Sequence, residues 1–167
     1  TTNNSIANGN PKADEGFTAV IEMASCAGLP LVENHKDPLG ATTYGVGELL
    51  LEAANHGATK IILGLGGSCT TDGGCGAAAA CGVKYYDKAG NSFIPTGGTL
   101  SQIEHIDISG LNPAIKTVDI VAMCDIENPM YGPEGAAYIF APQKGATENE
   151  VKLLDEGLIH LASVIKQ

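Results

Sequence analysis

The chain has 167 residues, 44% of them apolar, and its nineteen acidic against nine basic residues give a formal net charge of −10. A sequence of this length can bury the core of one domain, and none of its apolar runs approaches the roughly 20 residues that a membrane-spanning helix needs. All nine basic residues are lysines. This composition argues against binding to nucleic acids or membrane surfaces, and against any arginine clamp on a phosphate.

Residues 1–16 form a polar segment rich in Asn, Gly, Asp and Lys. The segment has neither the basic start nor the apolar centre of a secretion signal. We expect it to be flexible and to precede an α/β domain at 17–167 in a cytoplasmic protein. The five cysteines fit that compartment, because their number is odd and no C-x-x-C pair occurs. We expect them to be small buried residues.

Apolar patterns in the rest of the chain alternate between strand and helix periods, which predicts an α/β fold of undetermined strand order. Strands are expected at 17–23, 60–65, 83–86 and 118–123, the last of them buried. Helices are expected at 42–55, with Thr42 or Thr43 as the cap, and at about 73–80.

The pattern towards the C-terminus is less regular. Three apolar residues are spaced like one face of a short helix, namely Leu100, Ile103 and Ile106. The many prolines and glycines of 127–145 predict a loop around the apolar run 136–140. A final helix begins with a capping-box pattern at 147–150. Its apolar stripe comprises Val151, Leu154, Leu158, Leu161 and Ile165.

The most informative segment is 64–76, G-L-G-G-S-C-T-T-D-G-G-C-G, which follows one predicted strand and leads into the Ala-rich helix. Glycine adopts positive φ readily and can turn successive N–H groups toward one ligand, and a helix N-terminus adds partial positive charge. The segment therefore predicts a site for phosphate or carboxylate. The alternative is a connection or tight turn that only lets the helix pack on the sheet. The segment matches neither standard nucleotide loop, because Cys69 occupies the sixth Rossmann position and no lysine closes it as in a P-loop.

This Gly-rich segment carries its own acid, Asp72. A carboxylate there can bind a metal that bridges phosphates, or accept a proton from a substrate hydroxyl. It can equally serve as the N-cap of the following helix. The sequence leaves these alternatives open.

Two further segments place polar side chains where a ligand could bind. Asp125 and Asn128 follow a predicted strand and supply the oxygen ligands that Mg²⁺ prefers, unless Pro129 shapes an Asx turn there. Lys144 lies in a short loop bracketed by proline and glycine, and it either contacts an anion or is an ordinary surface lysine. Because ligands gather beyond the carboxyl ends of strands in open α/β sheets, the Gly-rich segment and Asp125 can face one site.

Five segments in order resemble the signature blocks of the type I glycerate kinases. They are E-M-A-S (22–25) with G-L (28–29), T-T-Y-G-V-G-E-L (42–49), the Gly-rich segment (64–76), C-D (124–125) with N-P (128–129), and P-Q-K-G-A (142–146). The resemblance extends over nearly all of the chain from Phe17 onward. The resemblance implies the fold of the second α/β domain of a two-domain kinase, since the family's first and last segments have no counterpart here. Two positions depart from the family pattern, which usually has alanine and asparagine where this chain has Cys69 and Thr71.

The resemblance further implies transfer of the ATP γ-phosphoryl group to a hydroxyl of D-glycerate, with Mg²⁺. In that reaction Asp72 and Lys144 would be catalytic, and Asp125 with Asn128 would hold the metal. Contacts to substrate or phosphate would come from Gly66, Gly67, Ser68, Thr71, Gly73, Gly74, Thr43 and, unless it is an ordinary surface residue, Glu48. The expected partners are complementary domain segments or a second copy of the chain. Without them the chain would be a non-catalytic fragment that binds a small hydroxy acid.

Overall fold

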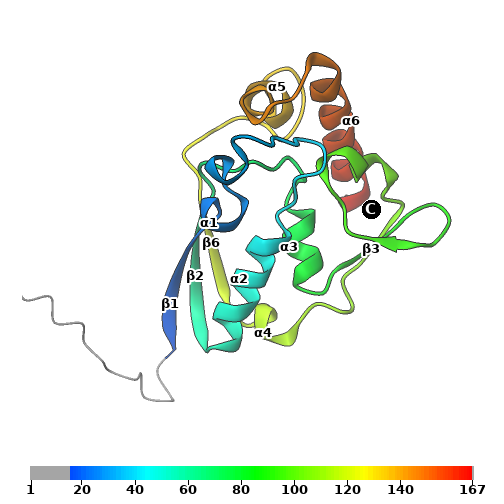
Figure 1. The fold of residues 1–167 in the computed structure, drawn as a ribbon. Helices are drawn as coiled ribbons and strands as arrows, with labels where there is room; N and C mark the ends of the chain where they lie inside the picture. Colours follow the sequence, from blue (N-terminus) through cyan, green and yellow to red (C-terminus); the bar gives the residue numbers. More distant parts are fainter. Residues whose placement is uncertain (1–15, 167) are drawn as a thin grey trace, which may run out of the picture.

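Two three-stranded sheets organise residues 16–166, the part of the chain that the computed structural model describes (Figure 1). The first sheet is parallel with the order β1-β2-β6, formed by β1 (Phe17–Glu22), β2 (Ala58–Gly64) and β6 (Asp119–Met123). The second is antiparallel with the order β4-β3-β5, formed by β4 (Ser92–Phe93), β3 (Lys84–Tyr86) and β5 (His105–Asp107). The predicted mixed α/β fold is confirmed.

Helices lie in most of the connections between these strands, and three more follow the last strand. The α-helices are α1 (Ala24–Ala27), α2 (Tyr44–Asn55), α3 (Cys75–Ala80), α4 (Pro113–Lys116), α5 (Ala136–Phe140) and α6 (Glu148–Ile165). The 3-10 helices are η1 (Leu29–Val32), η2 (Gly97–Gln102) and η3 (Pro142–Lys144). Across residues 16–166 none of these helices combines the length and the apolar character needed to cross a membrane. Of the predicted flexible segment 1–16, all but Gly16 lies outside the described residues.

Helix α3 lies between two apolar clusters. One cluster joins α2 to the parallel sheet and includes Cys81, whereas the other joins α6 to η2 and β3 and includes Cys75. The two cysteines at either end of α3 therefore face different cores, as their spacing predicts. A Cβ at Gly47 of α2 would lie 2.2 Å from the Ala77 carbonyl oxygen. Only small residues permit this close packing of α2 on α3, and it fixes the Gly-rich segment that leads into α3.

The final helix follows its predicted pattern closely. The Thr147 hydroxyl accepts a hydrogen bond from the Glu150 N–H, and the Glu150 carboxylate accepts one from the Thr147 N–H at 2.7 Å. Four of the five stripe residues are buried, but Ile165 is exposed because it lies in the last turn, beyond the cluster. The capping box thus fixes where α6 begins, and packing decides how far its apolar face is covered.

Two other expectations are wrong. Strand β6 is exposed along its whole length rather than buried, because it is an edge strand that pairs only with β2. Ile106 lies on β5 opposite Tyr85, since η2 ends at Gln102 and the chain then pairs with β3. Residues 127–135 form a loop as expected, and the apolar run 136–140 that follows them is the helix α5.

The cysteine expectation is correct for three residues and wrong for two. Cys69, Cys75 and Cys81 are buried, and all five thiols are free. Cys26 and Cys124 are exposed, because α1 and the segment after β6 lie at the surface.

Candidate active site

The Gly-rich segment leaves the carboxyl end of β2 and is anchored on the α1–η1 connection. The Leu29 N–H donates to the Gly67 carbonyl and the Cys69 N–H to the Ala27 carbonyl, both at 2.8 Å. Gly67 has a φ of +72°, a conformation that strongly favours glycine. A Cβ at Gly66 would meet no atom within 4 Å. The backbone at Gly66 therefore borders open space that a ligand can enter.

Asp72 lies at the centre of a hydrogen-bond network and is only 1% exposed. Its Oδ2 accepts from the Thr43 N–H and hydroxyl, both at 2.8 Å, from the Gly76 N–H at 3.2 Å and from the Thr42 hydroxyl at 3.5 Å. Its Oδ1 accepts from the Gly74 N–H at 3.1 Å. The N-cap of α3 is Gly74 rather than Asp72, but the Asp72 carboxylate still accepts from the Gly76 N–H in the first turn of that helix. The carboxylate thus joins the N-termini of α2 and α3, while Oδ1 keeps room for another donor.

Thr43 completes this network from the α2 side. Its hydroxyl donates to Asp72 and also accepts from the Ala77 N–H at 2.9 Å. Thr71 behaves differently, because its buried hydroxyl has no hydrogen-bond partner among the described residues. A buried hydroxyl without a partner carries a desolvation cost.

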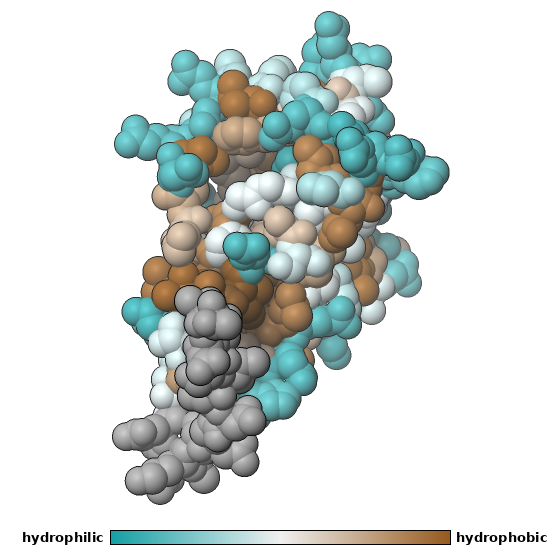
Figure 2. All heavy atoms as spheres, turned by 60° about the vertical axis from the view of Figure 1, so that its left-hand side comes forward, coloured by the Kyte–Doolittle hydropathy of each residue, from teal (hydrophilic) through white to brown (hydrophobic). Residues whose placement is uncertain are grey.

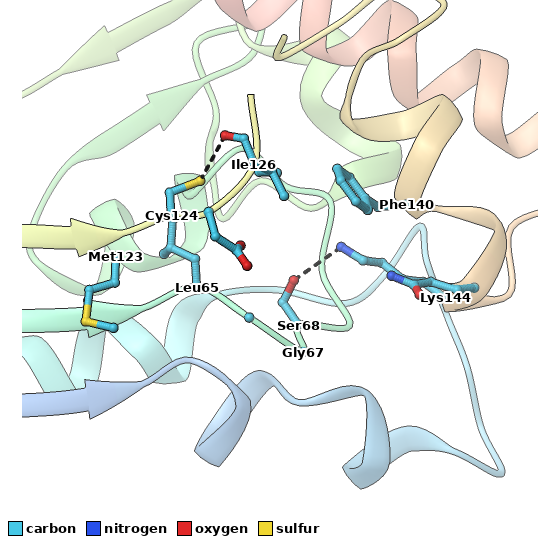
Figure 3. A pocket seen from close by; sticks show the side chains of 11 residues that line it. Leu65, Gly67, Ser68, Met123, Cys124, Ile126, Phe140 and Lys144 are labelled. Atoms are coloured by element: carbon cyan, nitrogen blue, oxygen red, sulfur yellow. Dashed lines mark hydrogen bonds between the residues drawn. The ribbon is translucent and has the colours of Figure 1, made fainter. Parts of the chain in front are cut away.

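Lys144 reaches the Gly-rich segment from the other side of the site. It is buried at the end of η3, and its Nζ donates to the Thr70 carbonyl and, at 3.3 Å, to the Ser68 hydroxyl (Figure 3). Burial lowers the pKa of Lys144 from the usual lysine value, and the nearby Cys69 and Asp72 oppose that shift. The surface alternative for Lys144 is therefore wrong, and its cation lies beside the predicted anion site.

A pocket of about 230 Å³ opens between the Gly-rich segment, the end of β6 and η3. Figure 3 shows Ser68 and Lys144 pointing toward each other, with Phe140 beside them and Leu65 and Met123 on the strand side. The backbone of Gly66 and Gly67 and the carboxylate residue Asp125 also line this pocket; its full lining is Leu65, Gly66, Gly67, Ser68, Met123, Cys124, Asp125, Ile126, Phe140, Gln143 and Lys144. The pocket thus combines backbone N–H groups, one hydroxyl, one cation and one carboxylate.

A second pocket of about 280 Å³ adjoins the first, because Leu65, Ser68, Phe140 and Lys144 line both. It extends past the Asp72 network toward α6. Its other lining residues are Met23, Thr43, Thr70, Thr71, Asp72, Gly73, Gly74, Met130, Ala136 and Leu158. Lys144 and Ser68 therefore form the wall between two neighbouring cavities.

Most of the predicted site residues meet in these two pockets, but Asn128 and Glu48 do not. Asn128 is exposed, and its Nδ2 donates to the Glu134 carbonyl at 2.9 Å. Glu48 is exposed on α2 and lines neither cavity. Among residues 16–166 no group of three or more His, Cys, Asp or Glu side chains could hold a metal ion. Of the pair Asp125 and Asn128 that the resemblance assigns to the metal, only Asp125 lines one of these two pockets.

Phe140 and Gln143 also line the first pocket. The sequence patterns indicated only Lys144 in this segment. The helical spacing of Ala136, Ala137 and Phe140 was the signal that could have indicated that α5 and η3 form a wall of the pocket.

The Cys69 thiol is not suited to act as a nucleophile. Burial is the largest of the influences on its pKa and raises it. This shift keeps Cys69 protonated at neutral pH and disfavours a thiolate nucleophile there.

Comparisons with known proteins agree with the resemblance. Residues 6–167 match the model of the glycerate kinase family. The chain is 50% identical over 154 residues to a glycerate 2-kinase of Escherichia coli K12 and 44% identical over 154 residues to a glycerate kinase of Bacillus subtilis 168. Each match covers 92% of this chain and 40% of the relative.

A solved structure has the same fold. The crystal structure of a putative glycerate kinase 2 from Salmonella typhimurium LT2 matches with a TM-score of 0.85 and 42% identity, over 89% of this chain and 40% of that chain. The chain therefore spans about 40% of the length of these relatives. On the family match, the sequence identity and the shared fold, this chain belongs to the glycerate kinase family.

Proposed function

We propose that this chain supplies the substrate side of a cleft in which the ATP γ-phosphoryl group is transferred, with Mg²⁺, to a hydroxyl of D-glycerate. The observation that carries the proposal is the position of Lys144. Its buried ammonium group lies on the wall shared by two pockets and faces the Gly-rich segment. Phosphoryl transfer depends mainly on positioning and charge neutralisation, which these residues can provide.

The anion-binding part of the cleft is formed by Gly66, Gly67, Ser68 and Lys144. The open backbone at Gly66 lets an oxyanion approach the N–H groups closely. The Ser68 hydroxyl and the Lys144 ammonium group, 3.3 Å apart, add a second donor and a positive charge. A glycerate carboxylate or a phosphate of the nucleotide fits this donor set.

Asp125 fits the requirement of a magnesium ion that is held mainly by phosphates. Mg²⁺ in kinases usually takes one or two carboxylates and completes its octahedron with phosphate oxygens and water. Asp125 is exposed and lines the same pocket as Gly66 and Lys144. When bound there, the ion would neutralise charge on the transferring phosphoryl group. The side-chain amide of Asn128 is engaged with Glu134, so Asn128 would contribute only through its amide oxygen.

For Asp72 we propose a role through Oδ1. Its Oδ2 already accepts four hydrogen bonds, which leaves no free lone pair for a substrate proton. Oδ1 accepts one bond, and Asp72 lines the second pocket. A hydroxyl of glycerate in that pocket could donate to Oδ1, either for orientation or for proton transfer. Gly73, Gly74 and Thr71 border the same cavity and would contact the substrate beside it.

We further propose that residues 17–167 are the second domain of a longer kinase. The chain spans about 40% of its relatives' length, which also favours a second candidate function. In that case the chain alone binds a small hydroxy acid without turning it over. The two candidates differ in whether ATP is consumed by the isolated chain.

Titration calorimetry of this chain with D-glycerate, with and without Mg-ATP, separates the candidates. Weak glycerate binding without turnover supports the binding fragment, whereas turnover without any added partner excludes it. A Lys144→Met variant should lose the binding heat. If D-glycerate produced no heat at any concentration tested, the substrate-side assignment would be wrong.

The catalytic proposal needs a complete protein, which a chimera supplies. The aligned segment of the Escherichia coli glycerate 2-kinase is replaced by this chain, and glycerate-dependent ATP consumption is measured for Asp72→Asn and Asp125→Asn. Both variants should lose activity, and Asp125→Asn should also raise the Mg²⁺ concentration needed for half-maximal rate. An Asp72→Asn chimera with near parental kcat would show that Asp72 is neither base nor ligand.

A further inference from the structure

One face of the parallel sheet carries a row of apolar side chains that no described element covers. The register places Val20, Ile62 and Val121 side by side across β1, β2 and β6. Met123 follows on the same face of β6, whereas Lys60 and Asp119 form an ion pair at 3.7 Å nearer the other end. Val20 is 72%, Met123 61% and Val121 39% exposed. We call this row of Val20, Ile62, Val121 and Met123 the outer face.

The opposite face is covered over β1 and β2 but not over β6, where Ile120 is 40% exposed. Ile61 and Leu63 of β2 belong to the buried cluster that also contains Val46 and Leu50 of α2. Ala19 and Ile21 of β1 pack on the same cluster. Figure 1 shows α2 lying against this covered side of the sheet. Figure 2 brings the left-hand side of that view forward and shows hydrophobic residues gathered in the lower half of the molecule.

The topology explains why only one face is covered. The strand order β1-β2-β6 follows the chain order, so both crossovers advance in the same direction. Crossovers between parallel strands are right-handed in almost all proteins. Two right-handed crossovers that advance in one direction place their helices on one face, which is where α2 and α4 pack together. No connection between these strands can cover the outer face.

Parallel sheets are normally covered on both faces, because their strands are apolar on both sides. The central outer-face residue Ile62 is half-buried between its strand neighbours Val20 and Val121. Among residues 16–166, the strands β1 and β6 are both edges of the sheet, each paired on one side only. A contiguous apolar row between two open edges is typical of a surface that another layer of protein covers.

We propose that the outer face is the docking surface for the remaining glycerate kinase polypeptide, the segments that flank this domain in its relatives. In the Escherichia coli and Salmonella proteins the matched part is 40% of the chain, so most of the polypeptide lies outside it and is available to form that layer. The inference rests on family membership and topology, and it does not depend on the proposed reaction.

The position of Met123 connects this surface to the candidate site. Met123 ends the outer-face row and also lines the first pocket beside Cys124 and Asp125. A layer packed along the outer face would therefore reach the open side of that pocket. The docked polypeptide would close the cleft at the carboxyl ends of β2 and β6.

The test measures the reaction of introduced cysteines with N-ethylmaleimide, resolved by peptide mass spectrometry. Val20→Cys and Val121→Cys report on the outer face, and Ile94→Cys, 51% exposed beside β4 in the second sheet, is the control. Each variant is compared in this chain alone and in the chimera with the Escherichia coli glycerate 2-kinase. The outer-face cysteines should react roughly tenfold more slowly in the chimera, because reaction then requires local opening, whereas Ile94→Cys should react equally in both.

Two results would overturn the proposal. Equal reaction of the outer-face cysteines in both proteins would show that the flanking segments leave the face open. Protection in the isolated chain that grows with its concentration would show that a second copy is the occupant instead. The same measurement at the aligned positions of the intact Escherichia coli enzyme needs no grafting and decides the matter even if the chimera folds poorly. No readout involves glycerate or ATP, so failure of the proposed function leaves this test intact.

Discussion

Asp72 and Asp125 both follow strands of the parallel sheet and both border the candidate site, but their surroundings differ. Asp72 is buried, and Thr42, Thr43, Gly74 and Gly76 together donate five hydrogen bonds to it. Asp125 is exposed at the open side of the first pocket. A buried carboxylate that accepts five hydrogen bonds from the fold stabilises the structure around it, whereas an exposed one is more accessible to a ligand. Two acidic residues that both follow strands of one sheet can therefore differ in role, one stabilising the fold and the other available to bind a ligand.

Neutralising each acid in turn should change the free energy of unfolding by very different amounts. Asp72→Asn should lower the free energy of unfolding of the chain by about 3 kcal/mol, because the new amide presents N–H groups to N–H donors and removes a charge that several hydrogen bonds stabilise. Asp125→Asn should change it by less than about 0.5 kcal/mol, as at ordinary surface positions. Urea unfolding of both variants measures the difference. Equal effects of the two substitutions would contradict the distinction between the two acids.

Lys144 tests whether the two pockets act as one site, since it lines both. Lys144→Met should weaken D-glycerate binding about tenfold or more, because a charge-assisted hydrogen bond contributes about 1.5 kcal/mol or more. The matched control is Lys36→Met, whose exposed ammonium group donates to the neighbouring Gln143 carbonyl at 3.0 Å. Calorimetry should show unchanged affinity for that control. Equal losses in both variants would mean that the overall charge of the chain, rather than the Lys144 position, governs binding.

The sequence predicted the elements whose signals are local. The periods of β1, β2, α2 and α6 and the capping box at Thr147 all depend on neighbouring residues, and they were predicted close to their observed positions. The exposure of β6 depends on which strand it pairs with and on what lies over the sheet. Ile106 lies in a strand because its segment pairs with β3, which is distant in the sequence. Such long-range facts have no local signature.

The same limit applies to the site. The glycines of 64–76 indicated an anion loop from composition alone, and its place at the carboxyl end of β2 follows from the strand before it. Two of the five hydrogen bonds to Asp72 come from Thr43, which is 29 positions away, so the sequence could not decide between the two roles of Asp72. Asn128 was selected for its chemistry, but a carbonyl six residues later engages its amide. Which polar groups remain free is a tertiary property.

Two buried threonines near Asp72 differ in the hydrogen bonds that their hydroxyl groups make. Thr71→Val removes a hydroxyl that has no partner among the described residues, and it should stabilise the chain by up to about 1 kcal/mol. Thr43→Val removes a hydroxyl that donates to Asp72 and accepts from Ala77, and it should destabilise the chain by about 1–2 kcal/mol. Thermal and urea unfolding measure both. A loss of stability in Thr71→Val would show that its hydroxyl has a partner in solution, and a loss of glycerate affinity would identify that partner as the ligand.

The smallest expected effect is the pH dependence that Lys144 contributes. Burial lowers its pKa from the usual 10.5 in the folded chain, so on raising the pH the folded state loses this proton before the unfolded state does. Where the unfolded state binds more protons, stability rises with pH. The free energy of unfolding of the parent chain should therefore rise relative to Lys144→Met as the pH approaches 10.5 and level off above it. Taking the difference between the two proteins removes the contributions of Cys75 and Cys81, whereas Cys69, which interacts with Lys144, still contributes to the difference. A difference that stayed constant or fell over this range would mean that Asp72 and Cys69 stabilise the ammonium form more than burial opposes it, and that the site holds its cation more firmly than its burial implies.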